Sequence, residues 1–113
     1  MPGGEALVAS LAAANMLMRV SAAEELQGWE LAGRHPNQKL ARQVLFHYGV
    51  PDLAIVPGGF FRALIDACAK ADPENRLRLS LAFPVLVWTL CAVELLPDGT
   101  DRLVALLERE AGT

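Results

Sequence analysis

Residues 79–93 read LSLAFPVLVWTLCAV, an uncharged stretch between Arg78 and Glu94 that contains a single proline, Pro84. A membrane-spanning helix needs about 20 consecutive apolar residues, so this stretch is too short and too interrupted to be one. It is also apolar on all sides, which leaves no polar face for water. We therefore predict that most of it is buried in a protein core or against a partner.

The residues around this stretch predict helices. Residues 72–74 (Asp-Pro-Glu) combine a capping side chain, a proline at the first helical position and an acid at the positive end of the helix dipole. The period-two alternation through Leu77–Leu81 is also typical of a strand, and this alternative stays open. Pro84 is expected to end this helix and to begin another that reaches Leu96, and Thr100 to cap a last helix.

Further helices are predicted upstream. The Ala-rich segment after Gly4 either ends near Val20, with a second helix capped by Ser21, or continues as one helix to Gly33. Apolar residues at helical spacing predict one helix over residues 38–48 and another that follows residues 57–59 (Pro-Gly-Gly). We read Leu53–Val56 as an extended linker. The predicted fold is all-α, a compact bundle of five or six short helices in a single domain over residues 1–113.

The amino-acid composition limits the classes of partner that this protein can bind. Hydrophobic residues make up 53% of the 113 residues and charged residues 20%, against typical values of about 45–50% and 25%. The apolar surplus either reflects abundant alanine or leaves an apolar surface patch for self-association or a protein partner. A net charge of −3 argues against binding nucleic acid through the global field.

The sequence contains no motif typical of catalysis, cofactor binding or metal binding. Cys68 and Cys91 each sit in an apolar run, and we predict reduced core thiols in a cytoplasmic protein. An acid precedes the first apolar segment where an export signal needs positive charge. His35 is expected in a loop and His47 on a helix flank, with no partner spacing for catalysis or metal binding. We therefore predict no enzyme activity, no cofactor and no metal.

Six residues are candidate partner contacts. Trp29 lies between acidic residues and is predicted to be an exposed aromatic anchor. Phe60 and Phe61 follow a flexible Gly-Gly joint that is expected to turn both rings into the core, and both are also named as possible partner contacts. The longest stretch without an acid, residues 31–51, contains Arg34, Lys39 and Arg42. These three cations are read either as a solvated face or as a contact for phosphate or an acidic partner.

The second half of the chain carries a distinctive order of short blocks: HYGVP at 47–51, ALI at 63–65, ADPENR at 71–76, FP at 83–84 and PDGTDRL at 97–103. In these blocks the chain resembles small helical proteins encoded by phages of actinobacteria. The resemblance implies a helical phage product of uncharacterised role, and it transfers no catalytic or binding residues.

The leading functional hypothesis is a non-enzymatic helical protein-interaction module. In this hypothesis a phage accessory protein self-associates or binds a host protein. The alternative is a small nucleic-acid-binding regulator that uses the basic segment Arg34–Arg42, and peripheral membrane association through the apolar segments is a third hypothesis.

Overall fold

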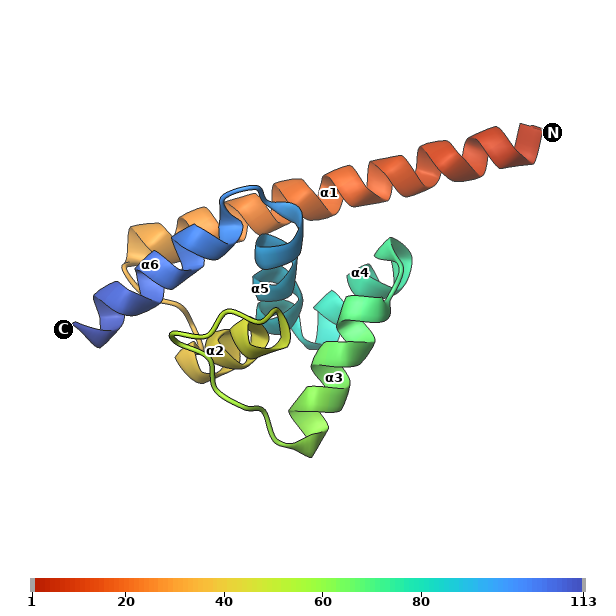
Figure 1. The fold of residues 1–113 in the computed structure, drawn as a ribbon. Helices are drawn as coiled ribbons and strands as arrows, with labels where there is room; N and C mark the ends of the chain where they lie inside the picture. Colours follow the sequence, from red (N-terminus) through yellow and green to blue (C-terminus); the bar gives the residue numbers. More distant parts are fainter. Residues whose placement is uncertain (1, 113) are drawn as a thin grey trace.

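The computed structural model describes residues 2–112, and it describes side-chain surroundings from residue 11 onward. Over this range the chain forms six α-helices and no strand (Figure 1). The all-α prediction is confirmed, and residues 77–81 are helical. The helices are α1 (Pro2–Ala32), α2 (Gln38–His47), α3 (Gly59–Lys70), α4 (Pro73–Ala82), α5 (Pro84–Leu95) and α6 (Gly99–Ala111).

Helix α5 lies at the centre of the molecule and contacts each of the other five helices (Figure 1). Because it has neighbours on every side, it needs no polar face, and Val87, Leu90 and Cys91 are fully enclosed. Trp88 is partly buried and packs against two clusters of core residues. The prediction of a buried stretch is therefore confirmed for α5. It is wrong for the corner before it, where Leu81 is 86% exposed.

Two glycines end helices at the predicted places. Gly33 follows α1 with φ 76°, and Gly49 follows α2 with φ 72°. In both turns the next amide donates to a carbonyl five residues back, from Arg34 to Trp29 at 3.1 Å and from Val50 to Leu45 at 3.0 Å. This is the Schellman pattern, which favours glycine because side chains disfavour positive φ. Of the predicted linker Leu53–Val56, residues 54–56 lie outside any helix, strand or turn, whereas Leu53 belongs to a turn with residue 52.

Side-chain caps begin α2 and α4. The Asn37 side chain accepts a hydrogen bond from the Leu40 amide at 3.1 Å, and the predicted cap Asp72 accepts one from Asn75 at 2.8 Å. The predicted cap of α6 is wrong by two residues, because the N-cap is Asp98, the helix begins at Gly99 and Thr100 lies inside it. Gly99 itself is buried against the backbone of α5.

Helix α1 is one continuous helix through Ser21, which resolves the alternative left open by the sequence. Its C-terminal half packs on α5 and α6 through the buried residues Met18, Ala22, Leu26 and Trp29. Its N-terminal half extends past the other helices (Figure 1). The result is a helical body from which one end of α1 projects.

Candidate functional site

The face of α1 that points away from the body is apolar. Met16 is 67% exposed, Leu17 52% and Val20 50%, and the exposed Ala13 precedes them at helical spacing. Met16 and Val20 each lie two residues from the buried Met18, which is about 200° around a helix of 3.6 residues per turn. These four residues form what we call the outer stripe of α1. Large apolar side chains at spacing i, i+3, i+4 and i+7 form a docking face for another helix.

Charged residues border the outer stripe. Arg19 and Glu24 are both exposed, and neither makes an ion pair within the described part of the chain. Further along, Glu30 accepts a 3.0 Å hydrogen bond from Nε of Arg102 on α6. This bond to the guanidinium holds the pKa of Glu30 below its usual range. The C-terminal end of α1 is thus tied to α6, while the ions near the outer stripe stay available to a partner.

Two of the predicted contact residues line one groove. Lys39 and Phe61 both face a groove of about 250 Å³ between the start of α2 and the linker before α3. Phe60 is 68% exposed, and its ring meets that of Phe61 edge-on at 5.5 Å between centroids. The expectation that the Gly-Gly joint turns both rings into the core is therefore wrong, and this aromatic pair lies at the surface.

The other two cations of the basic segment do not line that groove. Arg34 is exposed in the turn after α1, whereas Arg42 is only partly exposed. The carbonyl of Arg42 accepts a 3.1 Å hydrogen bond from Ile55 of the linker, and its Nε is enclosed without a hydrogen-bond partner in the described residues. Because Arg42 is half-buried, the basic segment offers fewer reachable charges than the sequence indicated.

The prediction for Trp29 is wrong. Trp29 is 8% exposed and packs with Leu26 and Leu106 in the contact between α1 and α6. Its ring also lies 4.5 Å from that of His35 between centroids. Neighbouring acids suggested exposure, but on a helix the residues beside Trp29 point to other sides, so a buried face can lie between them.

His35 lies in the predicted loop but is buried there, at 3% exposed. The Asn37 amide donates to its Nδ1 at 2.9 Å, so Nε2 carries the hydrogen and donates to Oγ1 of Thr89 at 2.8 Å. The backbone amide of His35 donates to Glu110 at 3.1 Å. Burial lowers the pKa of His35 to about 4. His35 is thus a structural link from the α1–α2 turn to α5 through its neutral ring and to α6 through its backbone amide.

A second polar cluster joins α3, α4 and α5. Arg76 is 6% exposed and donates to the Cys68 carbonyl at 3.0 Å, to the Ala69 carbonyl at 2.8 Å and to both carboxylate oxygens of Glu94. The Tyr48 hydroxyl donates to Glu94 at 2.7 Å, and burial raises its pKa. These groups satisfy one another, which is the arrangement of a structural clamp.

The thiols are not set up as nucleophiles. Cys68 and Cys91 are both free and fully buried, as predicted. Burial raises the pKa of both thiols, and that of Cys91 rises to about 12. A protonated, enclosed thiol neither attacks a substrate nor binds a metal.

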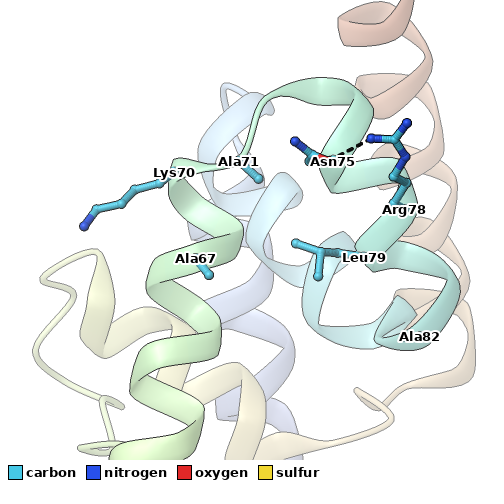
Figure 2. Close-up of a pocket in the computed structure, with 7 residues that line it drawn as sticks. All are labelled: Ala67, Lys70, Ala71, Asn75, Arg78, Leu79 and Ala82. Atoms are coloured by element: carbon cyan, nitrogen blue, oxygen red, sulfur yellow. Dashed lines mark hydrogen bonds between the residues drawn. The ribbon is translucent and has the colours of Figure 1, made fainter.

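Another groove, of about 480 Å³, lies between α3 and α4. Figure 2 shows Ala67, Ala71 and Leu79 along it, and Lys70 extending away from it. The bordering cations are already paired: Lys70 with Asp66 at 3.0 Å, and Arg78 with Glu74 at 2.7 Å. The dashed line in Figure 2 is a 3.0 Å hydrogen bond from Arg78 to Asn75. The groove is shallow and apolar, without a free polar group to orient a ligand.

Within residues 2–112, no three His, Cys, Asp or Glu side chains gather as a metal site would require. No helix in that range combines the length and apolar character needed to cross a bilayer. The chain matches no protein-family model, no curated protein and no solved structure.

Sequence reasoning missed both the outer stripe and the His35 link. The signal for the stripe was present, because Ala13, Met16, Leu17 and Val20 keep helical spacing in the sequence. An apolar stripe is normally assigned to a core, however, and α1 has two of them on opposite faces. For His35 the pattern carried no signal, since its partners Thr89 and Glu110 are distant in the sequence.

Proposed function

We propose that this protein is a non-enzymatic interaction module that binds another protein chain through the outer stripe of α1. The observation that carries the proposal is the exposure of Met16, Leu17 and Val20 on the face of α1 opposite Met18, whose own side chain is fully buried against the body. A contiguous apolar face that is exposed to water lowers the solubility of a protein. Such faces commonly mark sites of protein–protein contact.

The charges on α1 favour a protein over a membrane or nucleic acid. Arg19 is the single cation of α1, against the four acids Glu5, Glu24, Glu25 and Glu30. Helices that lie on anionic membranes carry lysine and arginine on their polar face, and phosphate binding also depends on cations. A partner polypeptide has no such requirement.

The polar clusters support a non-enzymatic role. His35, Arg76 and Glu94 are engaged with protein groups, and both thiols are protonated and enclosed. We place the module in the cytoplasm, since free thiols persist in reducing compartments. The role of a phage accessory protein is part of the proposal and rests on the resemblance in the second half of the chain.

Site-specific photo-crosslinking tests the proposal. A photoreactive phenylalanine analogue replaces Leu17 in one variant and Glu108, exposed on α6, in a matched control. We expect an adduct with another polypeptide in cells from position 17 and none from position 108. The adduct should disappear when Val20→Asp is added. No adduct from position 17, or an equal one from position 108, would overturn the proposal.

A further inference from the structure

Resting on the proposed function, we infer that the outer stripe binds a second copy of this chain, with the two α1 helices parallel and in register. Ala13, Met16, Val20 and Ala23 alternate in steps of three and four residues. This is the spacing of the a and d positions of a two-stranded coiled coil, and we call these four residues the seam. In the sequence the same spacing continues back to Ala9 and Ala6.

The charges beside the seam select a parallel pair. With Ala13 and Val20 at a positions, Arg19 takes position g and Glu24 takes position e of the following heptad. In a parallel dimer, g of one helix faces e of the next heptad on its partner, which brings Arg19 against Glu24 of the second copy, twice by symmetry. Neither ion is paired within the described part of the chain. An antiparallel pair would not bring these opposite charges together.

The body of the protein leaves room for this arrangement. The outer stripe lies across α1 from the buried Met18 and Ala22, so two bodies joined along the stripe lie on opposite sides of the helix pair. The contact uses the same surface on both copies, so it closes as a dimer and does not propagate into a fibre. The seam ends near Ala23, because Leu26 and Glu30 engage the chain's own α5 and α6.

The dimer should depend on concentration. Alanine at half of the seam positions lets the helices approach closely but buries little area. Stable protein interfaces bury at least about 1,200 Å² in total, and a seam of this length with so much alanine is expected to be smaller. We therefore expect a reversible monomer–dimer equilibrium.

Charge reversal tests the register. Sedimentation velocity over a concentration series is compared for the parent, Arg19→Glu, Glu24→Arg, the double reversal and the exposed control Glu108→Arg. Each single reversal turns two attractive pairs into two repulsive ones and should raise the dimer dissociation constant about fivefold or more. The double reversal should restore it, and Glu108→Arg should leave it near the parent value. Circular dichroism checks that each variant keeps its helix content.

A cysteine scan tests the geometry independently. Val20→Cys places a thiol at a seam position, where the two copies face each other, whereas Glu108→Cys does not; Cys68 and Cys91 are buried in both variants. Mild oxidation should link Val20→Cys into a covalent dimer and leave Glu108→Cys monomeric. Equal linking of both variants, or no linking of Val20→Cys, overturns the parallel arrangement.

The outcomes separate this inference from the proposed function. A parent that stays monomeric up to millimolar concentration, together with an adduct of position 17 to a different polypeptide, overturns the second copy and leaves the interaction module standing. A dimer that the double reversal does not restore overturns the register. A monomer with no adduct at position 17 overturns both.

Discussion

The His35 ring donates from Nε2 to Oγ1 of Thr89 at 2.8 Å, across 54 positions of sequence. Because Thr89 is fully buried on α5, this bond fixes the turn between α1 and α2 to the centre of the molecule. Glu110 of α6 accepts from the His35 amide, so one loop residue links three parts of the body from which α1 projects.

Stability should fall with acid because of His35. Burial lowers its folded-state pKa to about 4, whereas the unfolded chain protonates near pH 6.5. Above pH 6.5 both states are neutral, and below it the unfolded state binds the proton first. The free energy of unfolding should therefore decrease as pH falls from about 6.5 to about 4, by up to about 3 kcal/mol.

The measurement is urea denaturation at half-unit steps of pH, for the parent and for His35→Gln. The variant should start less stable and show a flatter decline between pH 6.5 and 5, a range largely above carboxylate titration. A decline of the same slope in the variant would show that His35 does not carry the effect. Titration of the His35 ring by NMR gives its folded pKa directly.

Removal of the Arg76 clamp should destabilise the fold. Arg76→Met leaves the Cys68 and Ala69 carbonyls without this donor and the Glu94 carboxylate with the Tyr48 hydroxyl alone. We expect a loss of about 2 kcal/mol, chiefly because two carbonyls lose a donor at the buried Arg76, while the partly exposed Glu94 is hydrated in its place. Arg76→Lys should recover only part of this loss, because an ammonium group cannot reproduce the guanidinium fork.

Denaturation midpoints of the two variants and of Arg78→Met measure the effect. Arg78 forms an exposed i,i+4 pair with Glu74, so its substitution should cost less than about 0.5 kcal/mol. Equal losses for Arg76→Met and Arg78→Met would contradict the clamp.

The two thiols should report on opening of the core. Both are fully buried, and burial raises the pKa of Cys91 to about 12. A thiol reagent added at pH 8 should therefore modify neither cysteine until the protein unfolds. Rapid modification of either residue in the native protein, measured by mass spectrometry, would place that thiol outside the core.

The helices and their ends were predictable because their causes are local. Pro73 and Pro84, the cap Asp72 and the glycines 33 and 49 act on residues within one turn, so their positions in the sequence carry the information. The Asp-Pro start favoured a helix over residues 77–81, but the alternation left a strand open, and the structure decides for the helix. The start of α6 is an exception, since Asp98 and not the predicted Thr100 is its N-cap.

The surface could not be predicted in the same way. Whether Trp29 or the outer stripe is buried depends on which face of α1 meets α5 and α6. The spacing of apolar residues in the sequence does not show which of two apolar faces is the buried one. The link from His35 to Thr89 joins positions that no spacing rule relates. Of the predicted contact residues, Arg34, Lys39, Phe60 and Phe61 are exposed, Arg42 is partly exposed and Trp29 is buried.

Two glycine substitutions of identical chemistry should have opposite effects. A Cβ at Gly99 would lie 1.7 Å from the Ala92 carbonyl oxygen, whereas a Cβ at Gly28 meets no atom within 4 Å. Backbone cannot yield as a flexible side chain does, so Gly99→Ala should force α6 away from α5 and cost about 3 kcal/mol or more. Gly28→Ala lies in the interior of α1 and should stabilise the protein by about 0.5–1 kcal/mol, since glycine has the more flexible unfolded state. The midpoints of thermal and urea denaturation of each variant, compared with those of the parent, measure these two changes in stability. A neutral Gly99→Ala would mean that α6 does not start against α5, and with it the seating of Leu103, Leu106 and Leu107 in the core would fail.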